Sequence, residues 1–330
     1  MARRGRRKNP AKRKVTSNTK FCDYYETWVH LYKKDLVSAV TLSKYRAAHR
    51  WIETSYPDLK VKDLDRNVYQ DMLNKYGETR EVVTVRGFKD LTSRPLKDAF
   101  YNGLVKRDPT YSIVIKGLPT KDTGVSKFLN EEELKTLVDN LKLDNVLSLD
   151  WFIYLMLLTG TRYQETLAIT PSDFDFRKGE ITINKAWDYK SLEEGFSKTK
   201  NKASNREIYV GREVLDSFKL LLEDRPREED IFGGKKVRYF NGNFQQLSWN
   251  STVNIHLKDF CKEIGIPKIT LHSLRHTYAS ILLAADVSML SVSYQLGHTS
   301  TVTTSKVYAH QTNRMKEKEV QRLNQIFRNK

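Results

Sequence analysis

Two short segments of the sequence concentrate basic side chains in a way that suits the binding of an anion. The first reads Thr-Gly-Thr-Arg-Tyr-Gln-Glu over residues 159–165 and carries Arg162. The second reads Leu-His-Ser-Leu-Arg-His over residues 271–276, and its His272 and Arg275 are three positions apart, so both project from one face of a helix. Arginine suits a phosphate because its planar fork donates two hydrogen bonds and stays charged. One such segment alone is more typical of a surface ion-pair helix, whereas two of them together with the residues that follow favour a phosphate site assembled from distant parts of the chain.

A third segment lies downstream and is followed by a tyrosine. A Leu-Gly-His sequence ends at His298, ten residues before Tyr308. In this order the segments resemble the catalytic domain of the tyrosine recombinases, the phage-type integrases, which carry a Thr-Gly-x-Arg box with a following acid, His-x-x-Arg-His, Leu-Gly-His and then a tyrosine. The resemblance covers about residues 17–315 and includes an Asn-Gly-Leu-Val-Lys-Arg-Asp-Pro run at 102–109, similar to the usual end of that family's helical core-binding domain.

The resemblance implies a reaction in which Tyr308 attacks the scissile phosphate, forms a 3′-phosphotyrosyl link and releases a 5′-hydroxyl. The residues that grip the phosphate are then Arg162, His272, Arg275 and His298. Negative charge builds up on the phosphate during attack, so cations stabilise the transition state more than the ground state. Tyrosine has a reference pKa of about 10 and must lose its proton as it attacks, and by resemblance His272 receives that proton. Glu165 is expected to orient Arg162 or a neighbouring basic group without touching the DNA.

The leaving 5′ oxygen needs a proton donor, and in this family a lysine on a β-hairpin loop provides it. The stretch 198–206, Lys-Thr-Lys-Asn-Lys-Ala-Ser-Asn-Arg, occupies the corresponding place. Counting back from the strand that starts at Arg206 selects Lys200. Lys198 and Lys202 stay open as alternatives, because the length of this loop varies.

We expect neither a cofactor nor a metal. The energy of the phosphoester is kept in the protein–DNA link, so rejoining needs no ATP, and the sequence has no P-loop. Asp173 and Asp175 lie in a turn ahead of a predicted strand, where a structural role is favoured over metal binding. His272 and His276 have the spacing of helical zinc ligands, but Ser273 stands where that motif needs its glutamate, so His276 is expected to pack in the core.

The composition of the whole chain favours a nucleic-acid partner. The 330 residues contain 57 Lys and Arg against 40 Asp and Glu, a net charge of +17, and surplus basic residues gain affinity for polyanions by releasing counterions. Charge alone leaves open a membrane-surface protein or a merely basic soluble one.

The longest apolar run, 151–158, is far shorter than the roughly 20 residues of a membrane span, and the N-terminus lacks the apolar stretch of a secretory signal. Cys22 and Cys261 have no CxxC partner, which fits a reducing compartment. We therefore expect a protein of the bacterial cytoplasm, associated with the nucleoid and without membrane contact.

Residues 1–16 are predicted to form a disordered basic arm that binds DNA, because they include no acid and almost nothing apolar. Its DNA-binding candidates are Arg3, Arg4, Arg6, Arg7, Lys8, Lys12, Arg13 and Lys14. The Arg-Gly-Arg at 4–6 resembles the minor-groove insert of AT-hooks, but generic phosphate binding is the favoured use.

The rest of the chain is predicted to be mainly α with a small antiparallel β-sheet. Tyr24, Trp28 and Leu31 follow a helical period, and similar patterns make 17–116 a helical core DNA-binding domain. A stretch at 117–127 with Pro and two Gly has the composition of a linker.

Residues 128–330 are predicted to form the tyrosine-recombinase catalytic domain with a helical tail. Two β-rich runs at 180–185 and 206–210 flank a polar, Lys-rich stretch expected to be a long hairpin loop, and a helical pattern continues from Leu215 to the end. The tail from 315 to 327 has a narrow apolar stripe, which either docks on a neighbouring protomer, as the resemblance implies, or packs on its own domain.

Three functions fit these features. The favoured one is site-specific integration and excision of a phage or mobile element, by a homotetramer on double-stranded DNA attachment sites, with an excisionase or a DNA-bending protein as candidate accessory partners. A type IB-like topoisomerase shares the chemistry but acts without pairing two sites, and the helical N-terminal domain favours the recombinase. A non-catalytic DNA-binding regulator would need no nucleophile.

Integrases that bridge distant arm sites usually carry a small β-rich N-terminal domain, whereas only a short basic arm precedes the first helix here. Either the enzyme works without arm sites or the chain is abbreviated.

Overall fold

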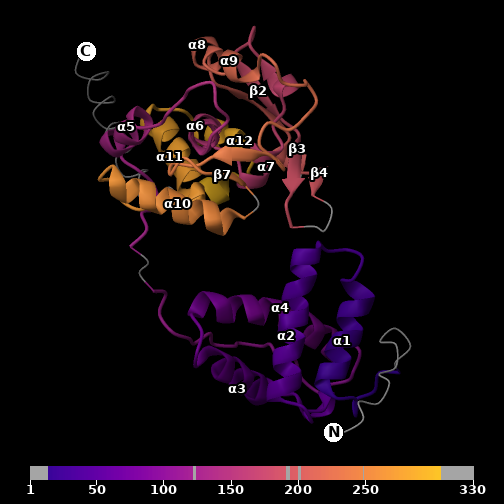
Figure 1. The fold of residues 1–330 in the computed structure, drawn as a ribbon. Helices are drawn as coiled ribbons and strands as arrows, with labels where there is room; N and C mark the ends of the chain where they lie inside the picture. Colours follow the sequence, from indigo (N-terminus) through magenta and orange to yellow (C-terminus); the bar gives the residue numbers. More distant parts are fainter. Residues whose placement is uncertain (1–13, 122–123, 191–193, 200–201, 248, 306–330) are drawn as a thin grey trace, which may run out of the picture. The chain divides into compact units, whose positions relative to one another are not determined.

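The structure is a computed structural model, which describes residues 14–121, 124–190, 194–199, 202–247 and 249–305. It divides into two compact units, unit 1 (Met1–Asp122) and unit 2 (Thr123–Lys330) (Figure 1). The division falls inside the stretch 117–127. The predicted fold class, mainly α with small antiparallel sheets, is confirmed.

The described part of unit 1 is a bundle of helices. They are α1 (Phe21–Tyr32), α2 (Ala39–Ser55), the 3-10 turn η2 (Val61–Asp63), α3 (Arg66–Gly77) and α4 (Val82–Tyr101). Ser38 and Asp65 cap α2 and α3 with their side-chain oxygens, which accept hydrogen bonds from backbone N–H groups of the first turn. The core between the helices is aromatic, with Tyr25 and Tyr69 fully buried. The buried face of α1 ends at Val29, so the predicted stripe runs one turn too far, and Leu31 is 58% exposed.

Unit 2 is built around α6 (Leu149–Thr159), which is apolar on nearly every side and buried by its neighbours. The helices of its described part are α5 (Glu131–Asp139), α6, α7 (Tyr163–Leu167), the 3-10 turn η3 (Pro171–Asp173), the 3-10 turn η4 (Lys202–Ser204), α8 (Arg212–Asp216), α9 (Lys219–Leu222), α10 (Asn250–Glu263), α11 (Leu271–Ala284) and α12 (Met289–Gln295). α5 begins with the N-cap Asn130, which forms a capping box with Glu133. In the described ranges, no helix is long and apolar enough to cross a membrane.

The main sheet of unit 2 has the antiparallel order β1-β2-β5. Its strands are β1 (Phe174–Asp175), β2 (Glu180–Ile183) and β5 (Arg206–Tyr209), with Ile183 opposite Arg206. The two predicted β-runs therefore pair with each other. The stretch between them is not a plain loop, because β3 (Lys185–Asp188) and β4 (Gly195–Lys198) form a further hairpin inside it.

The prediction of an unbroken helical pattern beyond Leu215 is wrong. β6 (Lys236–Arg238) and β7 (Phe244–Gln246) pair as a second hairpin between α9 and α10. Gly242 lies in the turn between these strands at φ +81°, a backbone conformation that ends a helix and that glycine adopts without steric cost. The tail at 315–327 lies outside the described residues.

Candidate active site

Arg162 lies just after the end of α6, where a glycine reverses the chain. Gly160 has φ +58°, and a Cβ placed on it would lie 2.3 Å from Cδ1 of Tyr278 on α11. Only glycine therefore lets α6 and α11 pack closely at this point. The chain then turns into α7, which starts with Arg162 in an extended backbone conformation at the N-cap position.

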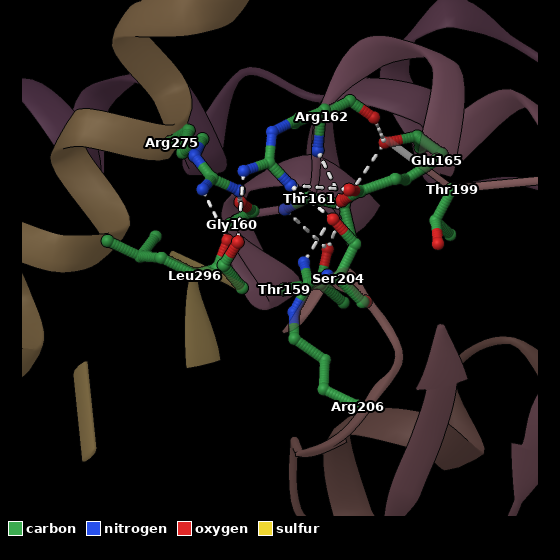
Figure 2. Close-up of polar contacts among 12 residues, drawn as sticks. Thr159, Gly160, Thr161, Arg162, Glu165, Thr199, Ser204, Arg206, Arg275 and Leu296 are labelled. Atoms are coloured by element: carbon green, nitrogen blue, oxygen red, sulfur yellow. Dashed lines mark hydrogen bonds and ion pairs between the residues drawn. The ribbon is translucent and has the colours of Figure 1, made fainter. Parts of the chain in front are cut away.

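Three segments of unit 2 contact the Arg162 guanidinium (Figure 2). Nη1 donates to Glu165 Oε1 at 2.6 Å and to Ser204 Oγ at 3.3 Å, and Nη2 donates to the Gly297 carbonyl at 3.1 Å. The side chain keeps 29% of its surface exposed, so it is held in place while part of it still faces solvent.

Glu165 is the acid that follows the first box, and it is buried between two arginines. Its Oε2 accepts from the Arg162 backbone N–H at 3.0 Å and from Nη2 of Arg206 at 3.0 Å. Burial by itself raises the pKa of a carboxyl group, but Arg206 and then Arg162 outweigh it and the pKa of Glu165 is lowered. Glu165 is therefore ionised at neutral pH and contacts Arg162.

Arg275 is carried by α11, one turn after the helix begins at the N-cap Thr270. It is 3% exposed. Its Nη1 donates to the Gly160 carbonyl at 2.6 Å, and its Nη2 donates to the Leu296 carbonyl. Arg275 thus joins the end of α6 to the loop that follows α12.

The Leu-Gly-His sequence is the C-terminus of α12. Gly297 has φ +60°, its N–H donates to the Tyr294 carbonyl, and the N–H of His298 donates to the Ser293 carbonyl. These two hydrogen bonds form the Schellman motif that ends many helices and that needs glycine at this position. The motif places the His298 imidazole beside the arginines, where its Nδ1 lies 2.8 Å from Thr304 Oγ1.

The three histidines of the site have lowered pKa values. Burial, Arg275 and Arg162 lower the pKa of His272. Burial and the same two arginines lower the pKa of His298 to about 4. His276, which meets His272 edge to face at 4.6 Å between ring centroids, has its pKa lowered to about 4 by burial and by the charge of His272. All three are therefore neutral at pH 7, and His272 is free to accept a proton.

Three guanidinium groups lie close to the Glu165 carboxylate. Arg162 and Arg206 form ion pairs with it, and the charge of Arg275 also lowers its pKa. Arg162 and Arg275 also donate to the carbonyls of Gly297 and Gly160. A phosphate that reached the exposed part of Arg162 would present oxygens of the kind that guanidinium groups bind.

The predicted lysine donors lie on the chain between β4 and β5. Lys198 is the exposed last residue of β4, and Lys202 begins η4. Thr199 Oγ1 donates to Asn205 Oδ1 at 2.8 Å across this stretch. Lys200 lies outside the described residues.

Two further groups of predicted site residues have little or no description. Tyr308 lies outside the described residues. The same holds for the arm residues Arg3, Arg4, Arg6, Arg7, Lys8, Lys12 and Arg13. Lys14, the remaining candidate of the arm, is exposed.

Asp173 and Asp175, for which a structural role is favoured, have structural contacts. Asp173 accepts from Lys185 Nζ at 2.6 Å and from the Thr170 backbone N–H at 2.8 Å, so it closes the η3 turn. Asp175 accepts from the Lys178 backbone N–H at 2.9 Å. Over the ranges that the structure describes, no group of three or more His, Cys, Asp or Glu is placed to hold a metal ion.

Sequence reasoning missed one residue of this site. Arg206 was used only to mark the start of a strand, yet its side chain has no exposed surface and contacts Glu165 directly. A signal was present in the sequence, because strand residues alternate between the two faces of a sheet. Arg206 shares the inward face of β5 with the buried Ile208, and an arginine on an inward face needs a polar partner.

Comparison with known proteins identifies a family, relatives and solved structures that this chain resembles. Residues 127–328 match the model of the phage integrase family. The chain is similar to the ICEBs1 integrase of Bacillus subtilis, 28% identical over 223 residues, which are 66% of this chain and 59% of that protein. It is 25% identical to a XerC-like tyrosine recombinase of Caldanaerobacter subterraneus, over 92% of this chain and 83% of that one. The fold is similar to that of the Tn1549 transposon integrase solved with circular intermediate DNA, with a TM-score of 0.70 at 20% identity, covering 92% of this chain and 99% of that one.

Proposed function

The chain belongs to the phage integrase family, and from this we propose that it is a site-specific DNA recombinase of a phage or mobile element. It cleaves one DNA strand at a time through a 3′-phosphotyrosyl link to Tyr308 and then rejoins the strand to a new 5′-hydroxyl. Its substrates are double-stranded attachment sites. The relatives named above are integrases and a tyrosine recombinase, which supports this class of reaction.

The observation that carries the proposal is the meeting of Arg162, Arg275, His272 and His298 from three separate segments. The carbonyls of Gly160, Leu296 and Gly297 hold the two arginines, and burial together with the charges of these arginines lowers the pKa of both histidines. Guanidinium groups held in fixed positions stabilise a phosphorane more than a phosphodiester, since more negative charge is present in the transition state.

We propose that cleavage proceeds by attack of the tyrosine, transfer of its proton and departure of the 5′ oxygen. The Oη of Tyr308 attacks phosphorus, its proton passes to neutral His272, and the bond from phosphorus to the 5′ oxygen breaks. The leaving oxygen takes a proton from a lysine, for which we propose Lys200. Rejoining is the reverse reaction with another 5′-hydroxyl, so the free energy of the bond is conserved in the covalent intermediate.

The identity of the acid has a direct test. A substrate with sulfur in place of the bridging 5′ oxygen releases a thiolate, which needs no proton donor. We expect Lys200→Ala to cleave ordinary DNA about 100-fold more slowly and to regain speed on the sulfur substrate. Lys198→Ala and Lys202→Ala are expected to be slowed equally on both substrates. Rescue of either of these in place of Lys200→Ala would transfer the role to that lysine.

We further propose that unit 1 is the core DNA-binding domain and unit 2 the catalytic domain. A surface groove between α2 and α4, lined by Lys44, Gly87 and Arg94 among others, supports this role for unit 1. Arg46, Arg50, Arg86 and Lys97 are also exposed on these helices. Basic side chains along a groove are the means by which proteins follow a phosphate backbone.

The assembly and cellular place follow from the same proposal. The protein acts as a homotetramer on two DNA duplexes, with the tail at 315–327 docked on a neighbouring protomer. An excisionase or a DNA-bending protein is the accessory partner, and the site of action is the nucleoid of the bacterial cytoplasm. Light scattering of the protein with its attachment site tests the stoichiometry, and a complex that stays at one protomer per site would contradict it.

The test of the function is covalent capture. The protein is incubated with a nicked duplex whose short 5′ fragment diffuses away after cleavage, and the products are run on a denaturing gel. The duplex is taken from the DNA that flanks the mobile element. We expect an adduct with the wild type and none with Tyr308→Phe. A wild type without adduct, or an adduct with Tyr308→Phe, would overturn the proposal.

A further inference from the structure

We propose that Arg206 is a positioning residue of the recombination reaction, which holds Arg162 and the His298 loop in place without touching the DNA. The inference rests on the proposed function, because it assigns Arg206 a part in the same cleavage step. In the sequence, Arg206 marks only the start of a predicted strand. The positioning role is inferred from the contacts of its side chain.

Arg206 binds three segments that are far apart in the sequence. Its Nη2 donates to Glu165 Oε2 at 3.0 Å, its Nη1 to the Ser204 carbonyl at 2.8 Å, and its Nε to the Gln295 carbonyl at 2.6 Å. These partners belong to the Arg162 box, to the end of the lysine stretch, and to the last turn of α12 before His298. One planar guanidinium thus fixes the relative positions of three parts of the active site, which a flexible ammonium group could not do with the same geometry.

The burial of Arg206 excludes direct contact with DNA. Its side chain is 0% exposed, whereas that of Arg162 is 29% exposed. Burying a guanidinium is costly unless every donor finds an acceptor, and burial lowers the pKa of Arg206 accordingly. Apolar packing would stabilise the fold as well or better, so the position of this cation at the centre of the site points to a positioning role.

The turn at Gly297 packs closely against the Arg206 side chain. A Cβ on Gly297 would lie 2.9 Å from Nη1 of Arg206 and 3.1 Å from the Ala203 carbonyl. The turn that carries His298 therefore lies directly against the Arg206 guanidinium. Arg162 donates to the carbonyl of the same glycine, so both guanidinium groups lie against this turn.

Loss of Arg206 would act on catalysis through Glu165. The carboxylate would keep Arg162 as a partner but lose the second cation, so its pKa would rise towards the value that burial favours. A protonated Glu165 no longer attracts Arg162. The variant should therefore need a higher pH than the wild type to keep Arg162 in place.

The experiment compares Arg206→Met and Arg206→Lys with a matched control, Arg225→Met. Arg225 is partly buried, burial lowers its pKa as it does that of Arg206, and its Nε donates to the Leu221 carbonyl at 2.8 Å. The readouts are the single-turnover rate of adduct formation on the nicked duplex and the Kd for the uncleaved duplex. We expect Arg206→Met and Arg206→Lys to slow cleavage about 10- to 100-fold, as loss of a supporting contact does, with DNA binding changed less than about 3-fold. Arg225→Met should cleave like the wild type.

Two readouts separate positioning from a loss of folding. In Arg206→Met the decline of the cleavage rate at acidic pH begins at a higher pH than in the wild type. This shift disappears when Glu165→Gln is added. The double variant cleaves no more slowly than the slower single variant, because both act through Arg162. The positioning role would be overturned by any of three results: a pH profile of Arg206→Met that is not shifted, rate losses of the two single variants that add up in the double variant, or a cleavage rate of Arg206→Met equal to that of the wild type. Adduct formation by the wild type would still support the proposed function in each case. A wild type that forms no adduct would overturn both.

Discussion

Glu165 and Arg162 are joined twice, through the backbone N–H of Arg162 at 3.0 Å and through its Nη1 at 2.6 Å. One carboxylate therefore fixes both ends of the residue, the backbone at the start of α7 and the guanidinium that faces the site. This is why a buried acid three residues after the arginine matters to the proposed phosphate site.

Replacing Glu165 by Gln should weaken both the fold and the chemistry. The change leaves Arg162 and the buried Arg206 without their negative partner, and breaking a buried pair in this way costs about 3 kcal/mol. We expect that loss in the free energy of unfolding by urea, together with adduct formation slowed about 10- to 100-fold. The control is Glu229→Gln, which removes an exposed pair with Lys235 and should change stability by less than about 1 kcal/mol. Equal stability losses in the two variants would contradict the role given to Glu165.

Replacing Gly297 by Ala should disturb the turn that carries His298. The new Cβ meets Arg206 Nη1 at 2.9 Å, and φ is +60°, so a steric cost of about 1–3 kcal/mol adds to a conformational cost of about 1 kcal/mol. Gly242→Ala is the matched control, because Gly242 also has positive φ but has no atom within 4 Å of its Cβ position. We expect Gly297→Ala to unfold at a lower urea concentration than Gly242→Ala and to be the slower of the two in cleavage. The reverse order would show that the turn tolerates a side chain.

The pH dependence of cleavage should report His272. Burial, Arg275 and Arg162 lower its pKa below 6.5, so His272 is neutral and able to accept the tyrosine proton at pH 6.5 and above. As the pH falls through the lowered pKa, His272 becomes protonated and cleavage declines. Rates measured at sub-saturating DNA report the free protein, and we expect the midpoint of their acidic decline to lie below pH 6.5. Arg162→Met should move this acidic limb to higher pH, because one of the charges that lowers the pKa is gone. An acidic limb that moves to lower pH would exclude His272 as the proton acceptor.

Removing residues 1–14 should weaken DNA binding and leave strand cleavage intact. Each phosphate contact that is lost reduces the slope of log K against log salt by about 0.9, so a shortened protein should bind more weakly and depend less on salt. Titrations of a fluorescent duplex at several salt concentrations measure the slope, and adduct formation at saturating protein measures cleavage. A slope equal to that of the full chain would mean that the arm does not contact phosphates.

Much of the site follows from the sequence alone. The order and spacing of the boxes around Arg162, Arg275, His298 and Tyr308 pointed to the family that the comparison shows, and in the proposed chemistry each box supplies side chains for one part of a phosphate reaction. Local patterns also mark elements, such as the Asn-Glu-Glu-Glu run at 130–133, whose first residue caps α5. Such features depend on near neighbours in the chain.

Only the tertiary structure decided how the boxes are held together. The β3–β4 hairpin and the β6–β7 hairpin arise from pairing between strands too short to be recognised in the sequence. The Arg206 contacts to Glu165 and Gln295 span 41 and 89 residues, and no local pattern can report a partner at that distance. The physical reason is that a residue's type shows which bonds it is able to form, whereas its burial and its partners are set by the packing of elements from the whole unit.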